Sequence, residues 1–373
     1  MSTQPYAAPA DAGGSPLLLV GVGRAGCAAA ARIWRSSGGR IRTLLADTDA
    51  RTGIENPGVP FLLMGANRLG GAGAGGSVAN ARAAAHESMH DFAERAGTPR
   101  LAVVTAGLGG GTGGGASMEI LERLRRSGAV TLAFATMPFA FEGPAAAKAA
   151  MNARPLIERN ADASVFPPMD GLVGCADSAC MDEAFARGAD AAAAGITLFW
   201  RLLETPGYIS LDLERVRNLA ADAGPAVFIS ATASGPDRAE KILAALSDSP
   251  AYGADGRPPK ASKLVLGVMG GRDLRLAEVG GIAKGAAGIF GDPQEFAMGT
   301  VDDEDAFSGR ISVAAFAFAA PTRERRDSRR RGRAAPDPLS PMHGHFGGAE
   351  GNLWNGEDID VPTYIRRKLT LER

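Results

Sequence analysis

The chain has 373 residues, enough for two or more domains of ordinary size. Its 40 Lys and Arg residues nearly balance 41 Asp and Glu residues, and the resulting net charge of −1 excludes the overall basic field typical of nucleic-acid-binding proteins. The cysteines Cys27, Cys175 and Cys180 are too few and too scattered for a disulfide framework or a four-cysteine zinc site. We therefore expect a folded protein of a reducing compartment, without a structural metal.

The N-terminal region predicts neither secretion nor membrane insertion. No Lys or Arg precedes Arg24 and no apolar stretch precedes Leu17. The apolar run 313–320 has eight residues, whereas a membrane span needs roughly 20. Residues 1–15 are small, proline-containing and aperiodic, so we expect a disordered tail followed by a cytoplasmic protein.

From Leu17 onward, short apolar runs alternate with helix-length amphipathic stretches. The apolar runs predict buried strands at residues 17–20, 42–46, 101–105, 130–135 and 164–166. This alternation predicts an α/β fold with a Rossmann-like, doubly wound parallel sheet. An Ala-rich stretch, 181–203, predicts a long central helix that ends this first domain, which we place at residues 16–203.

A second pattern begins after a connector at residues 204–222. Strands are expected at 226–231, 263–268, 296–301 and 310–318, with helices at 237–246 and 274–286. We therefore predict a smaller α+β domain over residues 223–320. Residues 321–352 hold an arginine run and no hydrophobic period, which predicts a disordered linker, and residues 353–373 regain apolar side chains, which predicts a partner-binding peptide.

A first glycine loop follows the first predicted strand. Residues 21–26 read Gly-Val-Gly-Arg-Ala-Gly, a spacing that lets backbone amides and a helix N-terminus approach a phosphate, although a tight strand-to-helix turn would use the same residues. Asp47 and Asp49 lie 21 and 23 residues after Gly26. An acidic residue at about that separation binds the ribose of a dinucleotide, so a nicotinamide-dependent dehydrogenase is an alternative at this point.

Two further glycine loops weaken that alternative. Residues 107–115 contain seven glycines around Thr112, enough to wrap amides around several phosphate oxygens, with the Thr112 hydroxyl as a donor or a Mg²⁺ ligand. The loop lacks the Lys of a Walker motif, which excludes a P-loop NTPase. A third cluster, 70–77, precedes a predicted helix at 78–87 and is otherwise read as a flexible linker. Together the loops predict one polyphosphate held from several sides.

Residues 109–115, Gly-Gly-Gly-Thr-Gly-Gly-Gly, resemble the signature of the tubulin superfamily, and within it the chain is similar to the bacterial FtsZ family. Further matching segments lie at 21–28, 47–50, 71–74, 138–143, 184–185, 206–209 and 358–367. The resemblance implies a cytoplasmic GTPase that binds GTP or GDP, with Mg²⁺ as a possible additional ligand, and polymerises head to tail at the division site. It also implies a membrane-tethering adaptor that binds the C-terminal peptide through Asp360, Val361, Pro362, Tyr364, Ile365 and Arg366.

The resemblance places the nucleotide on a defined set of residues. Glu142 is the implied ribose contact and Phe185 stacks on the base, whereas Met169 and Ala189 replace the family's base-reading residues and Asp190 is a neighbouring substitute. The full predicted set is Gly21, Gly23, Arg24, Ala25, Gly26, Cys27, Asp47, Gly73, Ala74, Gly75, Gly109, Gly110, Gly111, Thr112, Gly113, Gly114, Glu142, Phe185 and Asp190.

Hydrolysis in this family uses two acids that one subunit presents to the nucleotide of its neighbour. Asp212 matches the first acid, Arg215 occupies the place of the second, and Glu214 lies beside it. We predict Asp212 and Glu214 as the catalytic residues, with slow or altered hydrolysis. A non-hydrolysing structural filament is the alternative, and a helix N-cap is the alternative role of Asp212.

Overall fold

The computed structural model describes residues 17–170, 193, 195–205, 207–249, 251–252, 257–319, 353–354 and 357–358. The chain divides into two compact units, Met1–Pro321 and Thr322–Arg373. The predictions for the N-terminal tail, for the linker at 321–352 and for the first part of the central helix lie outside the described residues.

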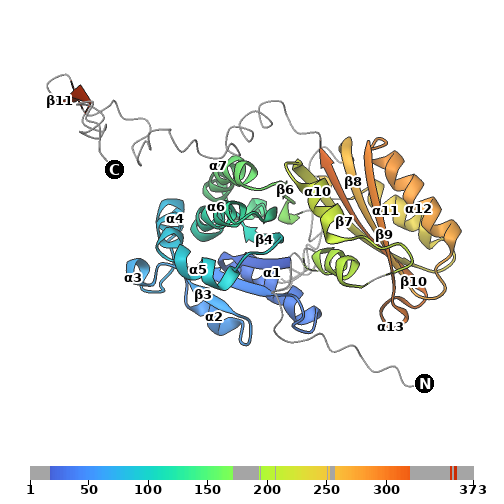
Figure 1. Ribbon diagram of the computed structural model, residues 1–373, viewed down its shortest axis with the longest axis horizontal. Coiled ribbons are helices and arrows are strands. Elements are labelled where there is room, and N and C mark those ends of the chain that lie inside the picture. The colour runs from blue at the N-terminus through green and yellow to red at the C-terminus, as the bar shows by residue number, and fades with distance from the viewer. Residues whose placement is uncertain are drawn as a thin grey trace, which may run out of the picture. The chain divides into compact units, whose positions relative to one another are not determined.

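The first part of unit one contains the predicted parallel sheet (Figure 1). Its strands were predicted to within three residues at either end, except for β3, a three-residue strand too short to give a pattern. In spatial order they are β3 (Phe61–Leu63), β2 (Thr43–Asp47), β1 (Leu17–Val22), β4 (Leu101–Gly107), β5 (Val130–Thr136) and β6 (Ala163–Val165), all parallel to their neighbours.

Both faces of this sheet are buried, as the unbroken apolar strands require. Alternate residues of β1 belong to different cores: Leu17 and Leu19 pack with α1, and Leu18 and Val20 pack with α5 and α6. The helices here are α1 (Gly23–Ser36), α2 (Arg51–Glu55), α3 (Ala66–Leu69), α4 (Val78–Glu87), α5 (Met89–Ala96), α6 (Gly111–Arg126) and α7 (Pro144–Asn160), with the 3-10 turn η1 (Ala140–Glu142). Because α1 follows β1 and α6 follows β4, both helices start at the carboxyl edge of the sheet.

The second part continues the same sheet. β7 pairs in parallel with β6 through Ala163 with Gly224 and Ser164 with Pro225, so ten strands form one sheet. The predicted elements of this part appear as β7 (Gly224–Ser234), α11 (Arg238–Ser247), β8 (Ala261–Gly270), α12 (Leu276–Ile289), β9 (Glu295–Asp302) and β10 (Arg310–Ala319). Two helices that were not among the predicted elements are also present: α10 (Leu213–Ala220), within the expected connector, and α13 (Glu304–Phe307). β10 lies antiparallel between β7 and β8, and residues 195–204 form the described part of the central helix.

Unit two contains one described pairing. β11 (Leu353–Trp354) runs antiparallel to β12 (Glu357–Asp358). The predicted partner-binding residues 360–366 lie outside the described residues. Within the described part of the chain, no helix is both long and apolar enough to cross a bilayer.

A buried carboxylate joins the two parts of the sheet. Asp162, 1% exposed, accepts hydrogen bonds from the Thr131 amide at 2.9 Å and hydroxyl at 3.1 Å, and from the Asp222 amide at 3.3 Å. Its own carbonyl accepts from the Gly224 amide at 2.7 Å. Since Asp222 and Gly224 lie where the chain enters β7, this one side chain fixes the junction to β5.

We expect Asp162→Ala to lower the free energy of unfolding by about 2–3 kcal/mol, because the buried Thr131 amide and the half-buried Asp222 amide lose their acceptor. Urea unfolding measures the loss. Asp302→Ala, at an exposed carboxylate at the end of β9, is the control and should change stability by less than about 0.5 kcal/mol. Equal effects of the two substitutions would contradict the role of Asp162.

Candidate functional site

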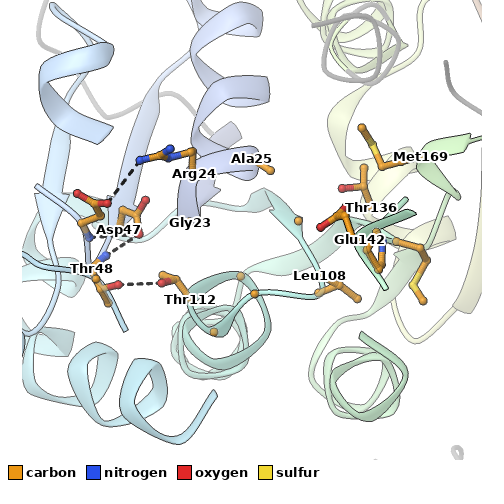
Figure 2. A pocket seen from close by; sticks show the side chains of 18 of the residues that line it. Gly23, Arg24, Ala25, Asp47, Thr48, Leu108, Thr112, Thr136, Glu142 and Met169 are labelled. Atoms are coloured by element: carbon orange, nitrogen blue, oxygen red, sulfur yellow. Dashed lines mark hydrogen bonds and ion pairs between the residues drawn. The ribbon is translucent and has the colours of Figure 1, made fainter. Parts of the chain in front are cut away.

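A cavity of about 420 Å³ lies at the carboxyl ends of the parallel strands, the edge at which open α/β sheets bind ligands (Figure 2). Segments that follow β1, β2, β4, β5 and β6 contribute to it. The residues that line it are Gly23, Arg24, Ala25, Asp47, Thr48, Asp49, Arg51, Gly73, Gly107, Leu108, Gly110, Gly111, Thr112, Gly113, Thr136, Met137, Pro138, Glu142 and Met169.

Two helices begin at this cavity. α1 starts at Gly23 and α6 starts at Gly111, and both residues line it. The first amides of a helix have no intrahelical acceptor and the helix dipole adds partial positive charge there. Within these two fully described helices, no acidic residue occupies the first turn. The cavity is therefore built to receive an anion, with two helix N-termini directed at it.

The three glycine loops found in the sequence meet in this cavity. The predicted nucleotide-binding residues that line it are Gly23, Arg24, Ala25, Asp47, Gly73, Gly110, Gly111, Thr112, Gly113 and Glu142. Phe185 and Asp190 lie outside the described residues. The predicted residues that the cavity lining does not include are Gly21, Gly26, Cys27, Ala74, Gly75, Gly109 and Gly114.

Several of these other glycines serve helix packing. A Cβ atom on Gly26 would lie 2.2 Å from the Thr105 carbonyl oxygen, and one on Gly21 would lie 2.8 Å from the Ala30 Cβ. In α6, a Cβ on Gly113 would lie 2.0 Å from the Gly107 oxygen. The glycine spacing therefore also brings α1 and α6 against the strands, in line with the tight strand-to-helix turn that was the alternative interpretation of the first loop.

Cys27 lies beneath the cavity, on the buried side of α1. Its side chain is fully buried, and its thiol donates to the Gly21 carbonyl at 3.3 Å. Burial raises the pKa of the thiol well above its usual value, with a further contribution from the Asp47 carboxylate. The thiol is therefore held neutral as part of the core.

Asp47 holds the turn after β2. It is 2% exposed and accepts from the Thr48 amide and the Thr52 hydroxyl, both at 2.7 Å. Burial raises the pKa of its carboxyl group above the ordinary value. The next hydroxyl, Thr48, lies 2.8 Å from the Thr112 hydroxyl, a hydrogen bond that links this turn to the start of α6. The predicted ligand Thr112 thus has a protein partner that the sequence did not indicate.

Charged side chains surround the turn after Thr48. The Asp49 carboxylate accepts from Arg51 Nε at 3.0 Å and from Arg51 Nη2 at 2.7 Å, and Arg24 Nη2 lies 3.5 Å away. The hydrogen bond from Arg51 is the main cause that lowers the pKa of Asp49 to about 2. Arg51 was not among the predicted residues, although it lies only two residues after Asp49.

The opposite side of the cavity is less charged, and Figure 2 shows Leu108, Thr136, Glu142 and Met169 gathered there. Glu142 accepts from the Phe139 amide at 2.8 Å, which closes η1. Asp170, the next residue after Met169, accepts from the Ala140 amide at 3.1 Å and is not part of the cavity lining among the described residues. Met169 lines it instead.

Sequence reasoning missed Thr48, Arg51, Gly107, Leu108, Thr136, Met137 and Pro138 as lining residues. Each follows the end of β2, β4 or β5 by no more than a few residues. Their position at the ends of predicted strands could have identified them, because parallel strands bring their carboxyl ends to one edge of the sheet.

The two predicted catalytic acids lie elsewhere on the subunit. Asp212 is the N-cap of α10 and accepts from the Arg215 amide at 2.7 Å. Glu214 lies 2.6 Å from Arg217 and 2.6 Å from Arg100, and the hydrogen bond from Arg217 is the main cause that lowers its pKa. Neither Asp212 nor Glu214 is among the described residues that line the cavity.

The loop before Asp212 is fixed to the edge strand β9. The Ile209 amide donates to the Thr300 hydroxyl at 3.0 Å, and the Thr300 amide donates to the Ile209 carbonyl at 2.8 Å. A Cβ atom on Gly207 would lie 1.7 Å from the Thr300 oxygen, so this approach requires glycine. Tyr208 is nevertheless 90% exposed. The loop is thus anchored on one side and open on the other.

The described residues contain no cluster of three His, Cys, Asp or Glu side chains able to hold a metal by themselves. The cavity offers the hydroxyls of Thr48 and Thr112, oxygen ligands of the kind that Mg²⁺ accepts together with phosphate oxygens. These groups fit a magnesium ion that depends on a bound polyphosphate.

Comparison with known proteins identifies this architecture. Residues 16–177 match the GTPase domain of the tubulin/FtsZ family. These residues form a divergent tubulin/FtsZ-family GTPase domain. Every residue that lines the cavity, from Gly23 to Met169, lies inside it.

Relatives of this GTPase domain extend the similarity beyond residue 177. The cell division protein FtsZ of Pseudomonas putida is 29% identical over 294 residues, which cover 78% of this chain and 73% of that protein. An FtsZ dimer from M. jannaschii superposes with a TM-score of 0.72 at 23% identity, covering 82% of this chain and 89% of that one. CetZ2 from Haloferax volcanii, solved as a GTPγS-bound protofilament, gives 0.68 at 21% identity, with coverages of 84% and 95%. The two structures show that the fold is shared.

We expect Gly26→Ala to lower the free energy of unfolding of the protein by about 1–3 kcal/mol, because the new methyl group meets the Thr105 carbonyl. Gly280→Ala, also inside a helix but with open space among the described residues, should raise it by about 0.5–1 kcal/mol. Thermal unfolding of both variants measures the difference. If both were stabilising, the contact of α1 with β4 would not require a glycine.

Proposed function

We propose that this protein binds GTP or GDP in the cavity at the carboxyl edge of its sheet and polymerises head to tail into cytoplasmic filaments at the division site. One observation carries the proposal: three glycine loops and two helix N-termini, separated in the sequence, line a single cavity. A nucleoside triphosphate supplies several anionic oxygens in a row, which is the ligand that such a set of amides suits.

The relatives support the assembly part of the proposal. The Pseudomonas putida relative is a cell division protein, and the structural relatives include an FtsZ dimer and a CetZ2 protofilament. We infer that copies of this chain associate in the same way. We propose that the C-terminal peptide, with Tyr364 and Ile365, binds a membrane-tethering adaptor. The proposal includes no specific nucleic acid as a partner.

The two sides of the cavity fit the two ends of the nucleotide. Glu142 lies at the less charged side and is the proposed ribose contact, with Met169 beside the base. The triphosphate would then extend toward Thr48 and Thr112, where the start of α6 supplies amides. Mg²⁺, if bound, would share its coordination between these hydroxyls and the phosphates.

Hydrolysis would take place between subunits. Asp212 lies outside the cavity of its own chain, on a loop that β9 holds and that exposes Tyr208 to solvent. We propose that this loop meets the cavity of the next subunit, where Asp212 polarises the attacking water and Glu214 assists. Asp212 caps α10 at the same time, so its orientation is fixed before assembly.

The second candidate function is a filament that binds nucleotide without hydrolysing it. The arrangement around Glu214 favours it, because Arg100 and Arg217 already hold this carboxylate. Arg215, which occupies the place of the family's second acid, is exposed in the first turn of α10. Filaments that hydrolyse GTP should disassemble after the GTP is consumed, whereas filaments that bind nucleotide without hydrolysing it should persist.

The nucleotide site is tested at Gly110, the N-cap of α6. Gly110→Asp should leave stability unchanged, because Asp is a good N-cap, but reduce GTP affinity by about tenfold or more, since its charge opposes the phosphates. Gly110→Asn is the matched control, with the same shape and no charge, and should bind clearly better than the Asp variant. Calorimetric titration with GTP, GDP and ATP measures this. Equal binding by the two variants would contradict the phosphate site.

Catalysis between subunits is tested by mixing variants. Asp212→Asn keeps the N-cap acceptor of α10 but removes the charge, so it should bind GTP and release little phosphate. Gly110→Asp should keep the acid but bind little GTP. Mixed together at concentrations that form sedimentable polymer, the two should release more phosphate than either alone, because each supplies what the other lacks. Phosphate release by the mixture no greater than the sum of the separate rates would contradict hydrolysis at the interface.

A further inference from the structure

Two arginines share one carboxylate at the charged side of the cavity. Arg24, at the start of α1, and Arg51, at the start of α2, both line the cavity and both face Asp49. Figure 2 shows the Arg24 side chain extending from α1 toward the side that holds Asp47 and Thr48. Asp49 is thus shared by two guanidinium groups, and a second carboxylate, Glu55, lies 4.0 Å from Arg24.

The two contacts with Asp49 differ in strength. Arg51 makes a close paired contact, with Nε at 3.0 Å and Nη2 at 2.7 Å, and its own amide donates to the same carboxylate at 2.9 Å. Arg24 is 3.5 Å from Asp49 and 4.0 Å from Glu55, distances of ion pairing without a short hydrogen bond. Its side chain is 59% exposed. Arg24 is therefore held loosely and Arg51 firmly.

We propose that Arg24 exchanges its contact with Asp49 for the terminal phosphate of a bound nucleoside triphosphate, so that the Arg24, Asp49 and Arg51 cluster sets the preference for triphosphate over diphosphate. This inference rests on the proposed function. It follows from the placement of the ribose at Glu142, which directs the end of the phosphate chain to the side where Arg24 lies.

The exchange requires little from the rest of the site. Exposed ion pairs contribute little free energy, whereas a guanidinium group makes strong paired hydrogen bonds to a phosphate that carries more than one charge. When Arg24 leaves, Asp49 keeps both side-chain hydrogen bonds and the backbone hydrogen bond from Arg51. Glu55 loses its 4.0 Å ion pair with Arg24, but its side chain is 53% exposed to solvent, so the lost contacts add little to the free-energy cost of binding.

Asp49 then acts as a competitor for Arg24. Its charge draws the guanidinium group away from the phosphate position, and Arg51 weakens that pull by sharing the carboxylate. Replacing Asp49 by Asn keeps an oxygen that can accept from the Arg51 amide while removing the charge that competes for Arg24. Asp49 is thus a positioning residue in this proposal, and Arg24 is the group that contacts the nucleotide.

The test compares dissociation constants for GTP and GDP below the concentration at which the protein polymerises. Arg24→Gln should weaken GTP binding by about tenfold and GDP binding by less than about twofold. Asp49→Asn should strengthen GTP binding severalfold, and this gain should disappear in the double variant that also carries Arg24→Gln. Circular dichroism verifies that each variant is folded.

Arg35→Gln is the matched control, because it removes the same charge from the last turn of the same helix, where Arg35 donates to Asn56. It should change neither dissociation constant. Equal losses of GTP and GDP binding in Arg24→Gln would overturn the inference, as would a gain from Asp49→Asn that persists without Arg24. If the wild-type protein bound neither GTP nor GDP, that result would instead contradict the proposed function. It concerns the wild-type protein and is therefore distinct from every outcome expected of the variants.

Discussion

The close approach of α1 and α6 to the sheet is the constraint on which the site depends. Gly26 lies against the Thr105 carbonyl and Gly113 against the Gly107 carbonyl, at distances where a Cβ atom has no room. Because α1 directly follows β1 and only residues 108–110 separate α6 from β4, this packing brings both N-termini to the same cavity. Their free amides and helix dipoles add up at one place, which makes the cavity selective for an anion before any charged side chain takes part.

Charged side chains then divide this cavity into two sides. Asp49, Arg24 and Arg51 lie at one side, and Met169 lies with Glu142 at the other. A buried carboxylate, Asp47, serves the backbone of the turn and is not free to bind a ligand without losing its hydrogen bonds to Thr48 and Thr52. The polar groups available to a nucleotide are therefore fewer than the number of acids and hydroxyls in the lining.

In the proposed mechanism, catalysis and structure compete for the same residues around α10. Asp212 caps the helix and Glu214 pairs with Arg100 and Arg217, and these contacts stabilise the subunit whether or not a neighbour is present. A carboxylate held by two arginines is less basic, as its lowered pKa indicates, and it activates water less well. This gives a physical reason for slow hydrolysis that does not depend on the identity of the nucleotide.

The sequence by itself determined the parallel sheet, the helices that follow its strands and the three glycine loops, because apolar runs and glycine spacing are local properties that a single chain displays. It did not determine which glycines face the ligand. Gly23 and Gly26 belong to one motif, yet Gly23 lines the cavity and Gly26 packs on β4. Nor did it show the pairing of Thr48 with Thr112, the sharing of Asp49 by Arg24 and Arg51, or the continuation of the sheet from β6 into β7. These depend on contacts between residues far apart in the chain or on side-chain directions, and only the tertiary structure decided them.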